Sequence, residues 1–375
     1  MVKGISSRGE VIIVGGGVIG LSIAIELKLR GVGVTVLSRS FQEATGHVAA
    51  GMLAPQAEQI PPSPMLELCD SSLSMYKDWT RKLESITGLD TGYWNCGILA
   101  PIYQEDSPVN TLQTDSSSRQ WLNQEAISQH QPNLGADVVG GWWYPQNGQV
   151  DNRRALMKVL RVAAQELGIN WHEGVEVKEI LNSPRKEVVA LKTNQGLIQG
   201  SHYILATGAW SQQLLPMPIY PKKGQMLSVK VPPGKEKLPL KQVLFGQQIY
   251  IVPRRDGLIV IGATSENVGF TPHNTPSGIQ QLLTQAIRLY PPLENFPIQE
   301  FWWGYRPATP DELPILGTSP WPNLTLATGH YRNGILLAPI TASLIADLVW
   351  EQKIDPLLTN FRWDRFEIGD CVDFP

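Results

Sequence analysis

The sequence predicts an α/β fold in which a helix-covered parallel sheet is interrupted by an inserted antiparallel sheet. Two short, continuous apolar runs, at residues 11–14 and 202–206, are typical of parallel strands that are buried on both faces. A glycine-rich turn and a helical pattern follow the first run. From residue 224 the pattern changes to an alternation of apolar and polar residues, which is typical of half-buried antiparallel strands.

The first apolar run leads into the turn Gly15-Gly16-Gly17-Val18-Ile19-Gly20. A helix and a second strand, Val34-Thr35-Val36-Leu37, complete the unit within about 30 residues, which is the context that a dinucleotide fingerprint requires. Gly15 permits the tight turn, Gly17 lets backbone N–H groups approach a pyrophosphate, and Gly20 lets the helix pack on the strand. The unit therefore predicts a Rossmann-like nucleotide domain, the alternative being an ordinary glycine-rich turn between a strand and a helix.

The second strand ends in Ser38 and Arg39, where such domains normally carry an acid that binds a ribose 2′-OH. Taken alone, this pair leaves two possibilities open. Either the chain binds its nucleotide without the acid, or Arg39 binds a ribose 2′-phosphate.

The remaining elements follow from periodicity and from turn residues. Asp151 is an expected N-cap. In chain order we expect a helix over 65–87, a surface loop over 104–118, a helix from 151 that ends near 168, strands over 171–180, 188–193 and 224–231, two strands within 249–264, a helix over 276–290, a strand over 301–310, and a strand, glycine turn and apolar helix over 324–350. The predicted nucleotide domain comprises 1–88, 140–220 and 302–375, and the inserted substrate domain comprises 89–139 and 221–301.

Composition narrows the classes of partner. The 375 residues carry a net charge of -3 without a basic stripe, which argues against nucleic acid and anionic membranes and favours a small-molecule substrate. Cys69, Cys96 and Cys371 are far apart and form no zinc or disulfide pattern, so we expect no metal site and a reducing, cytoplasmic location. The apolar stretch 11–27 is interrupted by glycines, which favours a buried strand, turn and helix over a membrane span, and the N-terminus lacks a secretory pattern.

Five segments carry a resemblance to a known family: GGGVIG, ATGHVAAGMLAPQAE, ILATGAW, GYRPATPD and GHYRNGILLAP. Together they resemble the D-amino acid oxidase superfamily of FAD enzymes and, within it, the glycine oxidases of thiamine biosynthesis. The resemblance extends from about residue 10 to residue 365. It implies a Rossmann-like FAD-binding domain with an inserted antiparallel-sheet substrate domain, and an enzyme of the amino acid oxidase class.

The resemblance also implies which residues contact FAD, although each could instead serve core or turn packing. They come from the glycine turn, the loop of residues 45–52, two strand ends and a turn near the C-terminus: Gly15, Gly17, Val18, Ile19, Gly20, Ser38, Arg39, Thr45, Gly46, His47, Ala49, Ala50, Gly51, Met52, Val175, Thr207, Gly208, Gly329, Arg332, Asn333, Gly334, Ile335 and Leu336. With FAD as ligand, Ser38 becomes a neutral hydroxyl partner of the ribose and Arg39 an exposed neighbour of the adenine.

The same resemblance implies a helix N-terminus after residue 329 that stabilises negative charge on the reduced flavin ring. It also implies noncovalent FAD, because no cysteine occurs near RPATPDELP, where related sarcosine oxidases attach the ring.

On the substrate side, the resemblance implies that Arg306 binds the substrate carboxylate through its planar fork and that Tyr250 adds an O–H to the same group. Alternatively, Arg306 pairs with Asp311, and Tyr250 is only a half-buried strand residue. Arg332 is expected to touch either the substrate or only the flavin turn.

Two pocket positions depart from the family pattern. Gln248 stands where some glycine oxidases carry histidine, and Ser265 stands where one form carries methionine. The choice among glycine, sarcosine and a small D-amino acid therefore stays open.

The implied reaction is hydride transfer from the substrate Cα to flavin N5, starting from the neutral amine, with no dedicated side-chain base and no metal. It gives an imine that hydrolyses to glyoxylate and ammonia or passes to a thiazole synthase, while O2 is reduced to H2O2. One alternative is an FAD-dependent D-amino acid or sarcosine dehydrogenase that uses another electron acceptor. Another is a flavin-binding module of RNA modification, against which the negative charge argues. Relatives suggest a homo-oligomer, possibly a tetramer.

Overall fold

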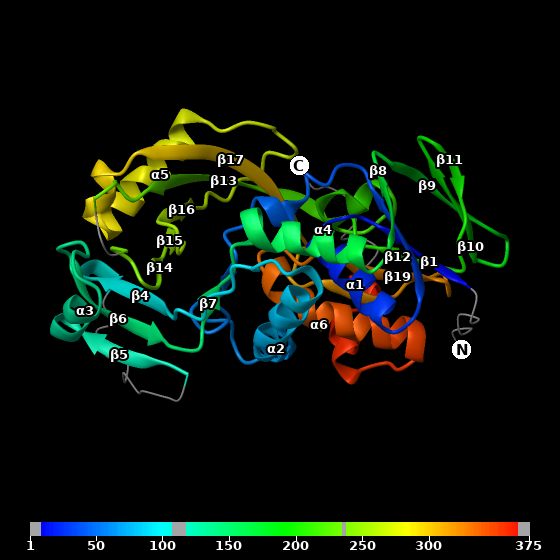
Figure 1. The fold of residues 1–375 in the computed structure, drawn as a ribbon, viewed down its shortest axis with the longest axis horizontal. Helices are drawn as coiled ribbons and strands as arrows, with labels where there is room; N and C mark the ends of the chain where they lie inside the picture. The colour runs from blue at the N-terminus through cyan, green and yellow to red at the C-terminus, as the bar shows by residue number, and fades with distance from the viewer. Residues whose placement is uncertain (1–8, 107–117, 235–237, 367–375) are drawn as a thin grey trace.

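The computed structural model describes residues 9–106, 118–234 and 238–366, and these form two parts that lie side by side along the long axis (Figure 1). One part is built on a six-stranded sheet and the other on an eight-stranded sheet. The chain crosses between the two parts several times, as the mixing of colours in Figure 1 shows.

The six-stranded sheet has the order β18-β19-β12-β1-β2-β8, in which every neighbouring pair is parallel except β18 and β19. Its strands are β1 (Glu10–Val14), β2 (Gly33–Ser38), β8 (Asn170–Glu173), β12 (His202–Leu205), β18 (Ile315–Thr318) and β19 (Leu324–Thr328). The predicted α/β class is confirmed, and the apolar runs of the sequence lie in its central strands.

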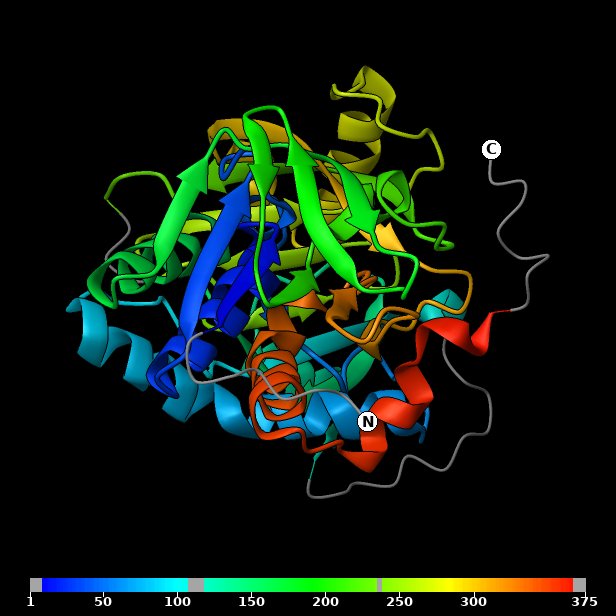
Figure 2. The same cartoon turned by 90° about the vertical axis from the view of Figure 1, so that its right-hand side faces the viewer.

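Both faces of this sheet are covered, which explains why its strands are apolar without alternation. Val11 and Ile13 of β1 pack on the helix side, whereas Ile12 and Val14 pack on the other side. The helices are α1 (Val18–Leu29), α2 (Pro64–Thr87), α4 (Met157–Glu166) and α6 (Gly334–Ala346). The opposite face is covered by β9 (Val177–Asn182), β10 (Val188–Thr193) and β11 (Gly196–Ile198), which lie in front in Figure 2.

The eight-stranded sheet has the order β17-β13-β16-β15-β14-β4-β6-β5 and is antiparallel except for the pair β14 and β4. Its strands are β4 (Ile98–Tyr103), β5 (Gln120–Asn123), β6 (Val138–Tyr144), β13 (Tyr220–Lys230), β14 (Val243–Phe245), β15 (Tyr250–Pro253), β16 (Leu258–Gly262) and β17 (Ile298–Ala308). Helices α3 (Gln124–His130) and α5 (Pro276–Leu289) share its apolar cluster. A separate pair, β3 (Met52–Leu53) and β7 (Gly148–Gln149), joins the two parts.

Short helical turns complete the described chain. They are η1 (Thr45–His47), η2 (Gln104–Asp106), η3 (Asn152–Leu156), η4 (Gly208–Gln213), η5 (Pro291–Asn295), η6 (Asp347–Glu351), η7 (Pro356–Phe361) and η8 (Trp363–Arg365).

The structure differs from the predicted elements in a few places. The single strand expected over 171–180 is two strands, because Gly174 adopts φ 75° and turns the chain out of the parallel sheet between β8 and β9. Asp151 is an N-cap as predicted, with its carboxylate accepting from Arg154 N at 3.3 Å, but the first turn, η3, is π-helical. Most of the loop expected over 104–118 lies outside the described residues.

Two of the predicted domain boundaries divide strands that each lie in a single sheet. The boundary at residue 140 falls inside β6 and the boundary at 302 falls inside β17, and both strands belong to the eight-stranded sheet.

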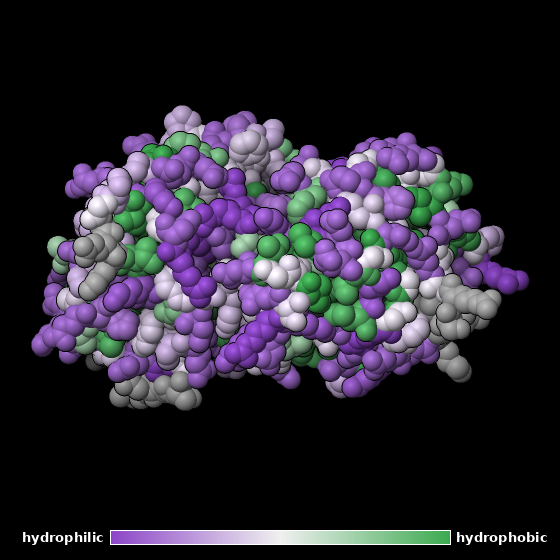
Figure 3. Space-filling model, viewed as in Figure 1, coloured by the Kyte–Doolittle hydropathy of each residue, from purple (hydrophilic) through white to green (hydrophobic). Residues whose placement is uncertain are grey.

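One apolar segment, Gly334–Glu351, is long and apolar enough to cross a membrane by length and composition, with a hydropathy of 1.5 over 18 residues. It comprises α6 and η6, and 67% of it is buried inside the protein, as in the core helix of a folded domain. Helix α6 packs against α1 and α2. The face drawn in Figure 3 is mostly hydrophilic, with apolar residues in scattered groups.

Candidate cofactor and substrate site

One long cavity of about 500 Å³ runs from the six-stranded sheet to the eight-stranded sheet. Its walls contain most of the residues that the resemblance assigns to FAD and to the substrate. Those residues are Gly15, Gly17, Val18, Ile19, Ser38, Arg39, Thr45, Gly46, Ala49, Ala50, Gly51, Met52, Val175, Thr207, Gly208, Tyr250, Arg306, Arg332, Gly334 and Ile335.

The first glycine turn is shaped to leave space for a ligand. Gly15 has φ 117°, and a Cβ placed on it would lie 2.3 Å from the carbonyl oxygen of Ala206. A Cβ on Gly17 would instead meet nothing nearer than Ala44 at 3.8 Å, so the backbone of Gly17 is open to the cavity. Gly17 is also the N-cap of α1, and no side chain caps that helix. Its free N–H groups are therefore available to an anion such as a pyrophosphate.

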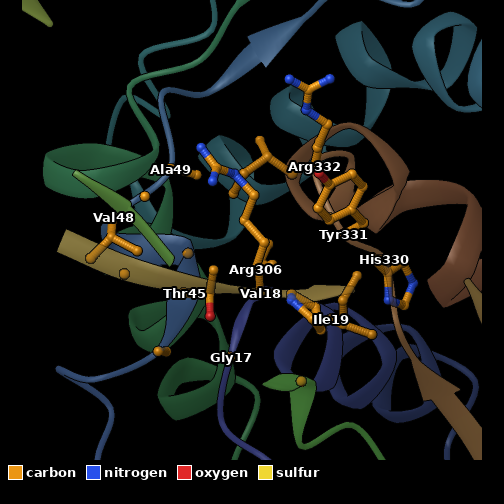
Figure 4. Close-up of a pocket in the computed structure, with 18 of the residues that line it drawn as sticks. Gly17, Val18, Ile19, Thr45, Val48, Ala49, Arg306, His330, Tyr331 and Arg332 are labelled. Atoms are coloured by element: carbon orange, nitrogen blue, oxygen red, sulfur yellow. The ribbon is translucent and has the colours of Figure 1, made fainter. Parts of the chain in front are cut away.

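A second helix N-terminus opens on the same cavity. Helix α6 follows the turn that contains Gly329, with φ 72°, and Tyr331, with φ 45°. Tyr331 N donates to Pro307 O at 3.0 Å, which joins the turn to β17. Asn333 is the N-cap of α6 without a side-chain hydrogen bond, so this helix too has uncapped N–H groups. Figure 4 shows Tyr331 and Arg332 from this turn, with the start of α1 below them in the view.

The loop of residues 45–52 is held by three side chains from distant segments. Asn152 Nδ2 donates to the carbonyls of Gly46 at 2.6 Å and Ala49 at 2.7 Å. Arg254 Nη2 donates to Ala50 O at 2.8 Å, and Trp302 Nε1 donates to Val48 O at 3.0 Å. Burial lowers the pKa of Arg254 to about 10, and this guanidinium is only 4% exposed. The carbonyl groups of the loop are therefore held by donors from other segments, which the sequence of the loop itself does not reveal.

The nucleotide end of the cavity lies at the end of β2. Ser38 is 1% exposed, and its carbonyl accepts from Val175 N at 3.0 Å. Arg39 pairs with Glu43 at 2.8 Å, and its Cζ lies 4.6 Å from the centroid of the Trp210 ring. The sequence predicted a position next to the adenine for Arg39, and the structure shows that its guanidinium lies over an indole of η4.

Arg306 reaches the cavity from β17 and is oriented by backbone carbonyls. Its Nη1 donates to Thr264 O at 3.1 Å and to Lys223 O at 3.4 Å. A Cβ on Gly224 would lie 2.7 Å from both terminal nitrogens of Arg306, so the guanidinium packs directly against this glycine. The alternative partner, Asp311, pairs instead with Arg365 at 2.7 Å.

Tyr250 from β15 lines the same region of the cavity. Its ring packs against Gly262, on which a Cβ would lie 2.7 Å from the phenolic oxygen. Burial raises the pKa of Tyr250 and the neighbouring Arg306 opposes this effect, so the phenol is neutral near pH 7 and can donate its proton. Arg332 also lines the cavity but is exposed, with its Cζ 5.7 Å from the centroid of the Tyr331 ring.

Five of the residues assigned to FAD do not line this cavity, and each has a structural position that explains why. Gly20 faces the Gly15 carbonyl, which its Cβ would meet at 1.9 Å, so it lets α1 pack on the first turn. His47 points the other way, edge-on to Phe41 at 4.6 Å. Gly329 and Asn333 shape the backbone before α6, and Leu336 is 2% exposed in the core.

Several residues line the cavity without having been singled out from the sequence as contacts. They include Val48, Glu58, Trp210, Gln213, Gln247, Thr264, His330 and Tyr331. Val48, His330 and Tyr331 lie beside assigned residues within the family segments, whereas Gln213, Gln247 and Thr264 come from segments without such a motif, so only the fold brings them to the cavity. His330 is buried and 3.1 Å from Thr341 Oγ1, and burial lowers its pKa to about 3, so it is neutral near pH 7.

These residues fit a long, anionic dinucleotide. Two uncapped helix N-termini face one cavity, and the glycine backbone between them is open. Such a site, on a doubly wound sheet with a second sheet beside it, defines a dinucleotide-dependent oxidoreductase. Within residues 9–106, 118–234 and 238–366, no group of three or more His, Cys, Asp or Glu side chains is placed to hold a metal.

Comparison with known proteins gives the family. The chain belongs to the family of FAD dependent oxidoreductases, whose model matches residues 10–348, and its cofactor is therefore FAD. It is 62% identical over 359 residues to a bifunctional protein ThiO/ThiG of Nostoc sp., and 30% identical over 367 residues to a glycine oxidase of Bacillus subtilis.

Coverage differs between these relatives. The match spans 95% of this chain but only 55% of the Nostoc protein, so the chain has about half the length of that relative. It spans 96% of this chain and 98% of the Bacillus enzyme. The crystal structure of glycine oxidase from Geobacillus kaustophilus superposes with a TM-score of 0.86 at 31% identity, covering 96% of this chain and 99% of that one. The resemblance predicted from the five segments is confirmed.

Proposed function

We propose that this chain catalyses the FAD-dependent oxidative deamination of glycine, and of sarcosine or small D-amino acids to an extent set by its pocket. The observation that carries the proposal is the placement of Arg306, whose fork faces the cavity between the two sheets and is oriented by two carbonyls rather than by an acid. The family and the glycine oxidases among its relatives support the same substrate class.

Arg306 and Tyr250 would bind the two oxygens of the substrate carboxylate, because a guanidinium fork and a neutral phenol both donate hydrogen bonds. Arg306 packs against Gly224 and Tyr250 packs against Gly262. This close packing on the backbone fixes the orientation of the guanidinium. When bound, FAD supplies the oxidant that accepts two electrons from the substrate C–N group. The uncapped N-terminus of α6 would stabilise negative charge at that end of the cavity.

The wider role is also part of the proposal. The Nostoc relative is named a bifunctional protein ThiO/ThiG, and this chain matches 55% of it, which supports delivery of the imine to a thiazole synthase. Noncovalent FAD, O2 as electron acceptor, a cytoplasmic location and a homo-oligomer, possibly a tetramer, complete the proposal.

The experiment is a substrate panel on the purified FAD-loaded protein. Glycine, sarcosine, D-alanine and D-proline are added anaerobically and the flavin absorbance is followed. We expect glycine to bleach the flavin, and bleaching by none of the four substrates would reject the proposal. Sarcosine or D-proline reacting faster than glycine would shift the assignment toward larger or secondary amines, for which Gln248 and Ser265 at the cavity wall are the positions to exchange.

The alternative is a dehydrogenase with the same substrate. It is tested by admitting air to the reduced enzyme and measuring H2O2. One peroxide per glycine consumed supports the oxidase. Reoxidation only by an added quinone supports the dehydrogenase.

A further inference from the structure

Glu58 lines the cavity, and the proposed function assigns no role to its carboxyl group. It lies in the turn after β3, where its backbone N–H donates to Ala54 O at 2.9 Å. The next residue, Gln59, has φ 53°, so the chain reverses directly after Glu58. The neighbouring Ala57 N is bound by Asn147 Oδ1 at 3.2 Å, which fixes the turn to the start of β7. The side chain of Glu58 is therefore carried on a fixed turn and lines the same cavity as Arg306, Tyr250 and Arg332.

Two arginines and one glutamate dominate the electrostatic surroundings of Glu58. Arg332 and Arg306 interact with it electrostatically and favour its ionised form, whereas Glu312 opposes it. Cys69 of α2 and Tyr250 of β15 also lie within electrostatic range, and burial raises the pKa of both, so neither carries charge near pH 7. Burial is the largest effect on Glu58 itself and raises its pKa. The Glu58 side chain is half-buried, and a carboxyl in a cavity with a raised pKa is a candidate for proton transfer.

An amino acid substrate presents two charges to this cavity. At neutral pH its carboxylate is negative and its amine is a positive ammonium. Arg306 and Tyr250 account for the carboxylate in the proposed function. Oxidation of the C–N group needs the nitrogen lone pair, so the ammonium must lose a proton within the site. Among the described residues, three glutamates line the cavity, and two of them, Glu43 beside Arg39 and Glu176 beside Val175, belong to the nucleotide end. Glu58 is the one whose electrostatic partners are Arg306 and Arg332.

We infer that Glu58 receives the substrate ammonium and accepts one of its protons, which makes it a selectivity and proton-transfer residue of the proposed amino acid oxidation. One N–H bond of the ammonium breaks and one O–H bond forms on the Glu58 carboxylate, while the electron pair stays on nitrogen. The oxidant is the FAD of the proposed function, on which this inference rests. Glu58 returns its proton to solvent after the product leaves.

The test compares Glu58→Gln with Glu58→Asp and with Glu67→Gln. Glu67→Gln is the matched control, because Glu67 lies in the first turn of α2, is exposed and does not line the cavity. FAD content and thermal stability are measured first for each variant. The probes are glycine, followed by kcat/KM from pH 6 to pH 10, and acetate, whose binding is followed by the flavin absorbance because it carries a carboxylate but no ammonium.

For Glu58→Gln we expect kcat/KM for glycine to fall about 100-fold near neutral pH, the usual size of an acid–base contribution. The value should recover toward the native one at high pH, where free glycine already has a neutral amine. Acetate should bind at least as tightly as to the native protein, because a negative neighbour has been removed. Glu58→Asp should keep part of the neutral-pH activity, and Glu67→Gln should match the native protein.

Three results would overturn the inference. A native pH profile in Glu58→Gln would remove Glu58 from proton transfer while leaving the proposed function intact. Loss of acetate binding in that variant would show that Glu58 only positions Arg332 or Arg306. If the native protein oxidises none of the amino acids in the panel, the proposed function fails first and this inference fails with it.

Discussion

The two ends of the cavity are built in different ways. At the six-stranded sheet the walls are backbone and small residues, with Gly15, Gly17 and the N-terminus of α1 presenting N–H groups. At the eight-stranded sheet the cavity receives two large polar side chains, Arg306 and Tyr250, which carbonyls and glycines of neighbouring segments hold in place. One end offers a ligand main-chain N–H groups and open space, and the other offers side-chain charge.

This difference determines how each end responds to mutation. Main-chain recognition has no side chain to remove, so it is broken only by adding atoms. Side-chain recognition is broken by deleting atoms, and the fold survives the deletion. Each substitution below affects one side of this contrast, or the loop that joins the two ends.

The largest effect is expected from Gly15→Ala. The new Cβ would lie 2.3 Å from the Ala206 carbonyl oxygen at φ 117°, so the turn must move. A strained backbone of this kind costs about 3 kcal/mol, which corresponds to roughly 100-fold weaker FAD binding if the cost falls on the bound state. Titration of the apoprotein with FAD measures it. Gly31→Ala, at φ 84° with no atom within 4 Å, is the control and should bind FAD normally.

Arg306→Ala should affect the other end alone. Loss of a charge-assisted hydrogen bond to the substrate costs about 2 kcal/mol, which is roughly 30-fold in the KM for glycine. FAD content should stay native, because Arg306 is oriented by Thr264 and Lys223 of the eight-stranded sheet. Steady-state kinetics with glycine provide the measurement, and an unchanged KM would exclude Arg306 from carboxylate binding.

Trp302→Phe tests the connection between the ends. It removes the donor to Val48 O, a contact of 3.0 Å, and replaces the buried indole by a smaller aromatic ring. One neutral hydrogen bond contributes about 1 kcal/mol and the lost ring volume adds to it, so we expect urea unfolding to show a loss of at least about 1 kcal/mol and FAD to bind a few-fold more weakly. Equal FAD affinity in the variant would mean that the other two side chains, Asn152 and Arg254, hold the 45–52 loop without Trp302.

The smallest effect is expected from Ser38→Glu, and it is a gain. An acid at this position is the usual partner of a ribose 2′-OH in such domains. Ser38 lines the cavity and is otherwise buried, so a longer side chain must extend toward the ligand. We expect FAD affinity to rise by a factor of about 3, as for one added exposed hydrogen bond. Weaker binding would place Ser38 away from the ribose.

Most residues assigned to the main-chain end line the cavity, because the backbone geometry that places them is local, and their contacts with FAD stay a prediction. Strand β1, the glycine turn and helix α1 are contiguous, and the role of each glycine follows from a fixed spacing. The same holds for the turn before α6. The sequence does not show which way a side chain points, and His47 and Leu336 point away from the cavity, toward Phe41 and into the core respectively.

The side-chain end was predictable only in part. Arg306 and Tyr250 were identified from the family motifs, but the carbonyls that hold Arg306 come from β13 and from the segment after β16. Arg254 and Asn152, which hold the 45–52 loop, lie outside the five family segments and had no local signal, whereas Glu58 ends the segment ATGHVAAGMLAPQAE and was assigned no role from it. Their partners are distant in the chain, so their roles depend on strand register, which a single sequence does not specify.

The topology of the parallel sheet has a consequence for the order of events during biosynthesis. Strand β1 and helix α1 are made first, but β19 and α6, which provide the neighbouring strand and the second helix N-terminus, are translated only at residues 324–346. A nascent chain that lacks them has half a cavity and an exposed face on α1, where α6 would pack. The complete cavity, with both helix N-termini, therefore forms only after this last unit has been translated.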